Sequence, residues 1–593
     1  MLAITGYADR WSVRPGETIR FMISVQGGGR YRARVARVIC GDPNPAGPGY
    51  REIPVPWTME GEHDGQQQDI QLGSWAAVPD VTLPDLTLAN GMLGFAATVW
   101  PTRLAADDQA VLSWAGAAGS ITLGIGPAGA TCRLVTSSGT QVLRTGMPLT
   151  ERAWHDIACV FDPKAGVLHL GQAPHRPRLD RVEAATCHAI APGGLAGLGA
   201  ACIAAEQAAG RATRHYNGKI ERPCMSVGAP DLGALLRAQR TGVACPTETP
   251  LAAWNFSRAM QGDTVEDWSG QERHGVLMNL PTRAMTGSNW DGTVHRWTDD
   301  PAQYGAIHFH DDDLGDAGWR PSLDLVVPGN WISGVYALHL ETPAGRDNIV
   351  FYVRAAVPGM QAKVAFLAPT FSYTVYGQFQ KAGRQALITE RSNEWGALAQ
   401  APDGHPEYGV SPYNLHSDGS GVVMSTMRRP LIDKRVNQIH LVDPSEGGSG
   451  VYWIAADSYL TDLLTREGIA FEVITDHDLH AEGVGLLSRY QVILTGQHPE
   501  YHTVETLDAL SAFLEGGGRL MYLGGNGFYW KVVPHADGPW SFELRRAEGG
   551  IRLWEALPGE GHHAHDGSYG GLWRRLGRAP QALVGVGFST QGD

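Results

Sequence analysis

Through the first part of the chain, apolar and polar residues alternate with the two-residue period that is typical of half-buried β-strands. The stretch SVRPGETIRFMISVQ alternates after a Pro-Gly turn, and YRARVARVI repeats the pattern. We therefore predict a small β-sandwich over residues 1–75.

Short strand-like segments separated by turn signals continue over residues 83–285. They include GMLGFAATVWPT, QAVLSWAG and ATCRLVTSSG. The phrase RAWHDIACVFDPKAGVLHL resembles laminin-G and concanavalin-like jelly rolls, so we predict a laminin-G-like jelly roll here. Residues 290–358 carry further β segments, such as GVYALHLE and NIVFYVRA, and predict a β connector or a third small sandwich.

The pattern changes at about residue 360, where continuous apolar runs alternate with segments of helical period. Predicted strands are KVAFLAP, VYWIAA, IAFEVIT, QVILTG and RLMYLGG. DSYLTDLLTREG is a predicted helix with Asp457 as N-cap and Gly468 as its end, and VETLDALSAFLEGGG is another. This alternation predicts a parallel sheet covered on both faces. We expect residues 360–593 to form a layered α/β domain of the flavodoxin or glutamine-amidotransferase kind.

Composition narrows the classes of protein. The chain has 593 residues, too many for one core, and a net charge of −14 with no basic run, so we expect no nucleic-acid partner. No apolar run is long enough for a membrane helix, and no secretory signal is visible, so we expect no membrane association. The seven cysteines, from Cys40 to Cys245, form no C-x-x-C pair and predict a cytoplasmic protein with reduced thiols.

Candidate chemistry gathers in the loops that follow the predicted parallel strands, where α/β proteins place their sites. These loops are rich in Tyr, His, Asp, Glu and Asn. A cysteine nucleophile is excluded there because no cysteine follows Cys245, and no G-x-S-x-G elbow is present. A metal-dependent hydrolase is the remaining enzyme class.

The loop GQHPEYH follows the predicted strand QVILT. Pro499 disfavours a helix at His498, so an extended segment would place His498 and Glu500 on the same side. The pair fits a metal or general-base site, and a hydrogen-bonded loop pair is the alternative. His502 is expected to be a surface residue beside a helix that starts at Thr503.

A long segment between the first two predicted strands, GHPEYGVSPYNLHSDGSGVVMSTMRRP, offers Tyr413, His416 and Asp418 as potential ligands. A phenolate is a hard oxygen donor and suits Fe(III) better than zinc. The segment therefore indicates either a ferric site or a simple hydrophobic pocket.

Four motifs together, FLAPTFSYTVYGQF, SPYNLHSDGSG, VILTGQHPEYH and YLGGNGFYW, follow the laminin-G-like block. Their combination resembles the large (β) subunit of the N,N-dimethylformamidase family over nearly the whole chain. The resemblance implies a mononuclear iron, expected as Fe(III), held by Tyr376, Tyr413 and Glu500. It also implies roles for His498 and Asn526 in catalysis. Tyr373 and Tyr408 compete with the two tyrosine positions.

The resemblance further implies an iron-dependent amide hydrolase that converts N,N-dimethylformamide and water to dimethylamine and formate by attack of a metal-activated water. A small α subunit and association of the heterodimer into larger assemblies are expected partners. Pro499 stands where a more polar residue is expected. The family's large subunit is longer than this chain, which predicts a fragment or a shortened relative, without any catalytic groups that the missing tail holds. Two alternatives are a relative acting on another small amide and a non-catalytic carbohydrate-binding or assembly protein that uses the laminin-G-like domain.

Overall fold

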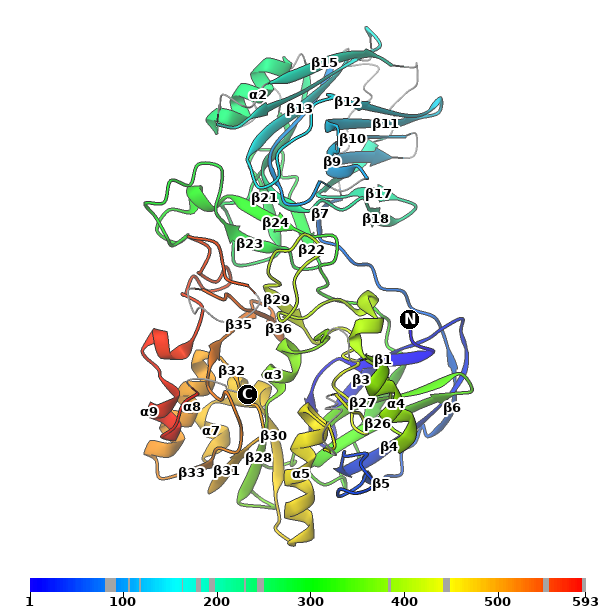
Figure 1. Ribbon diagram of the computed structural model, residues 1–593, viewed down its shortest axis with the longest axis vertical. Helices are drawn as coiled ribbons and strands as arrows, with labels where there is room; N and C mark the ends of the chain where they lie inside the picture. Colours follow the sequence, from blue (N-terminus) through cyan, green and yellow to red (C-terminus); the bar gives the residue numbers. More distant parts are fainter. Residues whose placement is uncertain are drawn as a thin grey trace.

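The computed structural model describes residues 1–79, 81, 92–104, 107–116, 119–162, 164–176, 183–190, 198–228, 231–242, 250–381, 385–440, 448–547 and 554–588. Figure 1 shows a β-rich part at the top, with an α/β part and a smaller β-sandwich side by side below it. Among the residues described, none of the helices combines the length and the apolar character that crossing a membrane requires.

The upper part is one 16-stranded hydrogen-bonded sheet folded around a single core. Trp114, Trp254 and Phe95 are fully buried in that core and come from strands far apart along the chain. Its strands are β7 (Trp75–Val78), β8 (Met92–Pro101), β9 (Gln109–Gly116), β10 (Gly119–Gly126), β11 (Gly129–Thr136), β12 (Gly139–Arg144), β13 (His155–Asp162), β14 (Val167–Pro174), β15 (Ala184–Ala189), β16 (Leu198–Ile203), β19 (Gly218–Gly228), β20 (Pro250–Asn255), β21 (Thr264–Asp267), β22 (Gly275–Met278), β23 (Thr282–Met285) and β24 (Ala306–Phe309). This confirms the prediction of a large β-rich unit.

Smaller elements complete this part. Helix α2 (Leu232–Thr241), N-capped by Asp231, packs Leu235 and Leu236 on the alanine-rich outer face of β8 and β13. Strands β17 (Glu206–Ala208) and β18 (Arg211–Thr213) form a separate pair, and the 3₁₀-helix η1 (Pro301–Tyr304) precedes β24. Because β24 pairs with β19, the sheet extends beyond residue 285, the end predicted from the sequence.

The lower sandwich combines two segments that the sequence analysis treated as separate units, 1–75 and 290–358. One sheet has the order β1-β3-β25 and the other β2-β27-β26-β4-β5, with β6 also paired to β4. The strands are β1 (Ile4–Ala8), β2 (Ser12–Val13), β3 (Thr18–Val25), β4 (Gly29–Cys40), β5 (Arg51–Pro54), β6 (Gly61–Gly65), β25 (Leu323–Val326), β26 (Gly334–Thr342) and β27 (Gly345–Val353). Phe21 lies opposite Leu323 and Ala36 opposite Ala337, so the two segments share one sandwich. Alternation within each segment could not reveal a partner about three hundred residues away.

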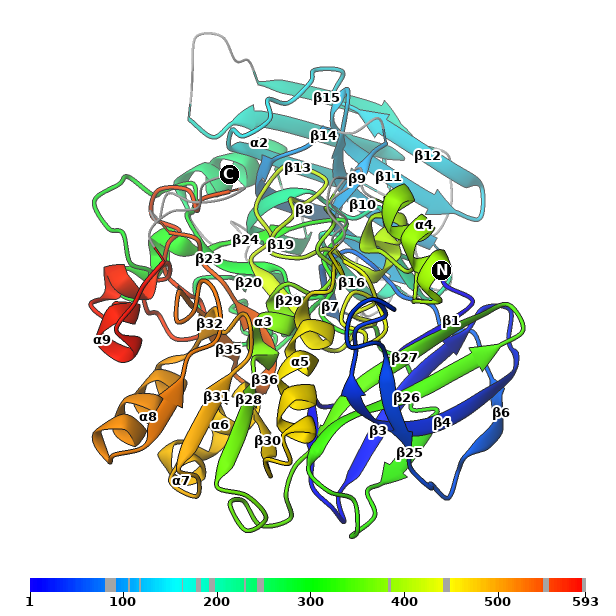
Figure 2. The same ribbon diagram turned by 60° about the horizontal axis from the view of Figure 1, so that its bottom comes forward.

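The α/β part contains the predicted parallel sheet, with four strands in the order β30-β28-β31-β33. The strands are β28 (Val364–Ala368), β30 (Glu472–Thr475), β31 (Val492–Thr495) and β33 (Arg519–Met521), and the helices of this part are α3 (Thr370–Val375), α4 (Gln385–Trp395), α5 (Trp453–Arg466), α6 (Asp476–Glu482), α7 (Val484–Leu487), α8 (Val504–Glu515) and α9 (Pro580–Val584). Seen from a second direction in Figure 2, α6, α7 and α8 lie beside the sheet and the N-terminal sandwich lies on its other side. The closer likeness to glutamine amidotransferases stays a prediction.

Short elements connect this sheet to the rest of the molecule. They are η2 (Pro402–Gly404), η3 (Pro406–Tyr408), β29 (Met424–Thr426), β32 (Tyr501–His502), β34 (Trp530–Lys531), β35 (Val533–His535), β36 (Gly538–Glu543) and η4 (Trp573–Leu576). One core joins the sandwich to the α/β part: Trp11 and Tyr352 pack in the same cluster as Phe366 and Tyr376.

Two predicted local features are wrong. The run VYWIAA is not a strand, because α5 begins at Trp453 and continues to Arg466. Its apolar residues face the core over successive helical turns, which a short window cannot distinguish from a buried strand. Asp457 consequently lies inside α5 and is not its N-cap; the N-cap is Tyr452.

Candidate functional site

The candidate site lies where the carboxyl ends of β28 and β31 meet. These strands are parallel neighbours, with Leu367 opposite Thr495. Helix α3 follows β28 and the GQHPEYH segment follows β31, so both emerge at the same edge of the sheet. Ser372 of α3 joins them, because its Oγ accepts the Glu500 N–H at 3.0 Å.

Pro499 forms the centre of a tight turn. The Glu500 N–H donates to the His498 carbonyl at 2.9 Å, which is a γ-turn hydrogen bond across one residue. The segment is thus more sharply bent than the extended conformation expected from the sequence. The two side chains nevertheless share one side, with His498 Nε2 2.9 Å from Glu500 Oε2. The predicted pairing of His498 with Glu500 is confirmed.

Two tyrosines complete a buried oxygen cluster around Glu500. Tyr376, at the end of α3, donates its hydroxyl to Glu500 Oε2 at 2.6 Å. The Tyr413 hydroxyl lies 3.3 Å from both carboxylate oxygens. The two phenol rings stack with centroids 3.9 Å apart, and Glu500 is only 1% exposed. We call Tyr376, Tyr413 and Glu500 the tyrosine site.

The competing tyrosines lie elsewhere. Tyr373 donates its hydroxyl to Asp457, and the Tyr408 hydroxyl accepts the Leu2 N–H at 2.9 Å. In the described part of the chain, neither has a hydrogen bond to Glu500. Tyr373 and Tyr376 are three residues apart, so helical spacing alone could not separate them.

Two functional candidates were missed in the sequence. The Tyr501 hydroxyl lies 2.5 Å from the Tyr413 hydroxyl, and Arg546 Nη2 donates to Tyr501 at 3.4 Å. The Arg546 guanidinium also lies 4.7 Å from the centre of the Tyr413 ring. Tyr501 stands within GQHPEYH, where its position beside Glu500 was the available signal, whereas Arg546 belongs to no motif.

Burial and the Glu500 carboxylate favour the neutral phenols, and the single nearby charge of Arg546 does not offset them at Tyr413. Desolvation, followed by the Glu500 carboxylate, raises the pKa of Tyr376 well above its usual range. The same causes raise the pKa of Tyr413. Burial lowers the pKa of Arg546, but attraction to Tyr501 and Tyr413 in their deprotonated forms outweighs it and raises the pKa overall. Deprotonation of the tyrosines therefore requires an additional positive charge in the site.

Aromatic rings enclose the imidazole side of the site. The His498 ring lies 5.8 Å from both Tyr452 and Trp453, and Trp453 packs against Tyr376 at 4.3 Å. Lys434 supports this wall from behind: its Nζ donates to the Tyr376 carbonyl at 3.3 Å and lies 4.3 Å from the Trp453 ring centre. These contacts fix the position of the Tyr376 backbone.

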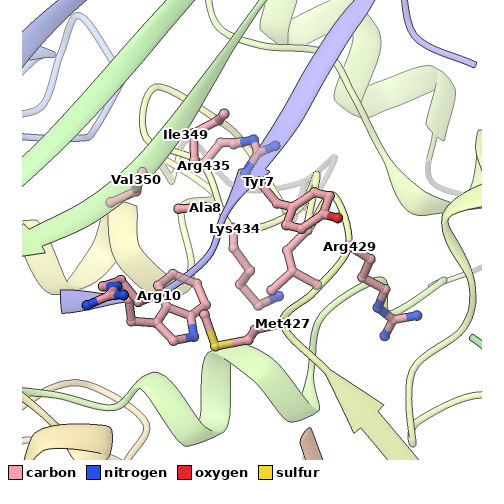
Figure 3. Close-up of a pocket in the computed structure, with 11 residues that line it drawn as sticks. Tyr7, Ala8, Arg10, Ile349, Val350, Met427, Arg429, Lys434 and Arg435 are labelled. Atoms are coloured by element: carbon pink, nitrogen blue, oxygen red, sulfur yellow. The ribbon is translucent and has the colours of Figure 1, made fainter. Parts of the chain in front are cut away.

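Behind this wall lies a small cavity of about 20 Å³. Its lining, drawn in Figure 3, includes the cationic residues Arg429, Lys434 and Arg435. Lys434 pairs with Asp433 at 2.6 Å, and Arg435 pairs with Asp347 at 2.9 Å. Arg429 donates to backbone carbonyls, including that of Gly377. Because these three cations have protein acceptors, the cavity has the character of a packing defect more than that of an anion site.

The other predicted site residues have different positions. His502 is completely buried, with Nε2 3.0 Å from the Pro499 carbonyl, so its prediction as a surface residue is wrong; the predicted helix start at Thr503 is confirmed. Asn526 is half-buried in a loop beside the GQHPEYH segment, since the Gly525 N–H donates to the Gln497 carbonyl. Among the described residues the Asn526 side chain has no hydrogen bond to the tyrosine site. His416 and Asp418 contact a separate group of histidines.

The donor set fits one chemical class of ion. Two phenols and a carboxylate converge within 2.6 to 3.3 Å, and all are oxygen donors. Hard oxygen ligands suit hard cations, and phenolates suit Fe(III) in particular. A bound cation of this kind would also supply the positive charge that tyrosine deprotonation requires.

Similarity to known proteins covers the whole chain. Residues 282–593 match the family model described as N,N-dimethylformamidase beta subunit-like, C-terminal. The N,N-dimethylformamidase beta subunit of Paracoccus aminophilus is 34% identical over 633 aligned positions, which cover 99% of this chain and 80% of that protein. The corresponding subunit of an Alcaligenes species is also 34% identical, covering 100% of this chain and 80% of that protein.

Two solved structures resemble the chain distantly. The mouse laminin alpha1 chain aligns with 30% of this chain and 51% of its own, at 13% identity and a TM-score of 0.19. A pentraxin from Limulus polyphemus aligns with 37% of this chain and 89% of its own, at 10% identity and a TM-score of 0.21. These structures carry no argument about function, whereas the sequence matches are decisive: the chain belongs to the N,N-dimethylformamidase beta subunit family.

Proposed function

We propose that this chain is an iron-dependent amide hydrolase that converts N,N-dimethylformamide and water to dimethylamine and formate. The observation that carries the proposal is the buried convergence of Tyr376, Tyr413 and His498 on the Glu500 carboxylate. The names of the two relatives support the choice of substrate.

Tyr376, Tyr413 and Glu500 would hold a mononuclear ferric ion as two phenolates and one carboxylate. Bound there, the iron would act as a Lewis acid and generate a nucleophilic water at neutral pH. The three anionic ligands balance the charge of Fe(III). Arg546, whose guanidinium lies 4.7 Å from the centre of the Tyr413 ring, would stabilise the negative charge of the deprotonated Tyr413.

His498 is the proton-transfer residue of this proposal. Its Nε2 lies 2.9 Å from Glu500 and 3.4 Å from the Tyr376 hydroxyl, so it reaches the centre of the site. In the hydrolysis, the water oxygen bonds to the formyl carbon and the carbon–nitrogen bond breaks. His498 accepts the water proton and donates it to the leaving dimethylamine nitrogen.

The surroundings of His498 suit a small amide with methyl groups. Tyr452 and Trp453 present ring faces and edges to the imidazole, and Phe379 packs against Tyr413 at 5.3 Å. Such walls exclude bulk water and bind apolar N-methyl groups. Asn526, in the neighbouring loop, is proposed to reach substrate when the site is filled.

We also propose a small α subunit as partner, because both relatives carry the name of a beta subunit. Association of the resulting heterodimer into larger assemblies is part of the same proposal.

The Glu500→Gln variant tests the function, because it keeps the side-chain shape and removes the charge. We expect iron content to fall at least about tenfold, with loss of the tyrosinate-to-iron absorption and of dimethylamine release. Glu505→Gln is the matched control, since Glu505 is 56% exposed on α8. Full iron content and full amide hydrolysis in the Glu500→Gln protein would overturn the proposal.

A panel of formamides and acetamides, assayed with and without the small subunit, separates this function from that of a hydrolase for another small amide. The highest kcat/KM on N,N-dimethylformamide supports the proposed substrate. If the enzyme preferred a different amide, the proposed reaction would stand and the proposed substrate would be wrong.

A further inference from the structure

A second group of ligand-type side chains lies between the upper sheet and the long connection that carries Tyr413. His308 is on β24 and His310 follows two residues later, so alternation places both on the same side of the strand. Asp418 arrives from the 416–420 loop. We call His308, His310, His416, Asp313 and Asp418 the histidine cluster.

The spacing of three of these groups matches metal ligation. His308 Nε2 lies 3.4 Å and His310 Nε2 3.9 Å from Asp418 Oδ2. The ligand atoms of these three residues all lie within 4.8 Å of one another. A tetrahedral zinc ion with bonds of about 2.1 Å separates its ligand atoms by about 3.4 Å.

Neighbouring groups orient these side chains as the outer shell of a metal site does. His310 Nδ1 lies 3.1 Å from Asp313 Oδ2, which in turn accepts the Ser74 hydroxyl at 2.6 Å. A carboxylate behind a histidine is the arrangement that fixes the ring and raises the basicity of its other nitrogen. The His416 ring stacks on His310 with centroids 3.7 Å apart, and limits its rotation further.

Asp418 is held equally firmly. Its Oδ2 accepts the Thr102 hydroxyl and its Oδ1 accepts the Ser420 hydroxyl, each at 2.5 Å. The Ser420 Oγ also lies 2.9 Å from His310 Nε2. The side chain is 0% exposed, although it belongs to a surface loop.

One buried nitrogen atom of the cluster lacks a hydrogen-bond partner among the described residues. His308 is 5% exposed, and its Nε2 has no hydrogen-bond partner of acceptable geometry among the described residues. A buried ring nitrogen without a partner is costly in a purely structural cluster. A metal ion between His308, His310 and Asp418 would satisfy it.

The histidine cluster also borders a cavity. His308 and Ser420 line a cavity of about 130 Å³ together with Trp100, Trp554 and Glu560. Three protein ligands and an open fourth position facing a cavity are the pattern of a metal that binds water or a small ligand.

We propose that His308, His310 and Asp418 form a second metal site, selective for a borderline divalent cation such as Zn²⁺. Imidazole nitrogens favour such ions, whereas the tyrosine site offers hard oxygen ligands. His416 and Asp313 are positioning residues that hold His310. The site is independent of the iron proposed at Glu500.

Zinc binding to the full chain tests the site. The Glu500→Gln background keeps the tyrosine site from contributing, and chelator-treated protein is titrated with Zn²⁺ against a chromophoric chelator. We expect one equivalent of tightly bound zinc. His308→Ala and Asp418→Asn are each expected to weaken it at least about 100-fold. His63→Ala, a histidine of the N-terminal sandwich, is the control and should retain the full affinity.

Co²⁺ provides a measurement that requires no substitution within the histidine cluster. In the Glu500→Gln protein with His308 and His310 intact, a saturable visible band of four- or five-coordinate Co²⁺ should appear at one equivalent and disappear on addition of Zn²⁺. No saturable band, or zinc binding unchanged in a folded His308→Ala protein, would overturn the proposal.

Discussion

The tyrosine site and the histidine cluster are both buried and both assembled from distant segments, yet their donors and surroundings differ. The first gathers oxygen atoms among aromatic rings at the edge of the parallel sheet. The second gathers imidazoles and carboxylates between the upper sheet and a loop, with hydroxyl groups around them. Aromatic packing surrounds the tyrosine site, whereas hydrogen bonds from hydroxyl groups hold the histidine cluster.

Two buried aspartates show what this difference does. Burial raises the pKa of Asp457, whose carboxylate accepts the Gln497 N–H just before His498, to about 6. Burial acts on Asp418 as well, but the neighbouring His308 and His310 imidazoles hold its pKa far below the usual range. The aromatic surroundings thus favour neutral groups, while the imidazoles favour the ionised carboxylate.

The largest loss of stability is expected from removing Trp453, an aromatic residue that encloses the tyrosine site. Trp453 is 1% exposed and packs against Tyr376, so Trp453→Ala should lower the free energy of unfolding by about 3–5 kcal/mol through the cavity it leaves. Urea unfolding followed by far-UV circular dichroism measures this loss.

Trp100→Ala is the matched change at the histidine cluster. Trp100 is half-buried and touches His308 edge-on, with ring centroids 6.4 Å apart, so we expect a loss of only about 1–2 kcal/mol. Equal losses for the two variants would show that packing holds both sites to the same degree.

A pH-dependent effect of intermediate size is expected at Asp457. Its folded pKa, about 6, is above its ordinary value of 3.8, so the protonated form stabilises the fold. That stability is fully present below about pH 4 and is lost as the pH rises through 6. The shift corresponds to about 3 kcal/mol.

Asp457→Asn keeps a neutral side chain at every pH. The variant should therefore gain stability relative to the wild type by about 3 kcal/mol between pH 4 and pH 7, measured by urea unfolding at several pH values. Parallel pH profiles of the two proteins would show that the pKa of Asp457 is the same in the folded and the unfolded protein, and would contradict the assignment.

Local features of the tyrosine site could be predicted from the sequence. The strand QVILT and the two-residue spacing of His498 and Glu500 predicted that both side chains share one side, although the segment is a tight turn at Pro499 and not extended. Tyr413 was a candidate ligand from its place in the long segment, whereas Tyr376 and the pairing of the two tyrosines came from the family resemblance. Their stacking depends on the course of the 401–430 connection, which carries no periodic pattern.

Long-range pairing is the part that the sequence could not supply. Arg546 reaches Tyr413 from another segment, and β25–β27 complete a sandwich that starts at the N-terminus. His416 and Asp418 were predicted as ligands near Tyr413, but the loop turns them toward His310. Tertiary contacts decide which donor atoms gather in one place. The period of hydrophobic residues along the chain carries no information about those contacts.

The smallest losses of stability are expected from removing single hydroxyl groups, one at each site. These changes compare the two sites most directly. Tyr501→Phe removes the hydroxyl beside Tyr413, and Ser420→Ala removes one of the hydroxyls that hold Asp418. Each change leaves other partners in place: Arg546 keeps the Pro412 carbonyl, and Asp418 keeps Thr102. We therefore expect each to cost only about 1 kcal/mol of stability.

The two variants should differ in which metal they affect. Ser420→Ala should weaken zinc binding about tenfold, because a hydrogen bond behind a ligand tunes its affinity, and should leave iron content unchanged. Tyr501→Phe should shift the tyrosinate-to-iron absorption and leave zinc affinity unchanged, since Tyr501 contacts Tyr413 but no member of the histidine cluster in the described part of the chain. Absorption spectra and zinc titrations on the same two proteins measure both effects. A change in both metals with either variant would mean that the two sites are coupled, because neither hydroxyl group contacts both donor sets.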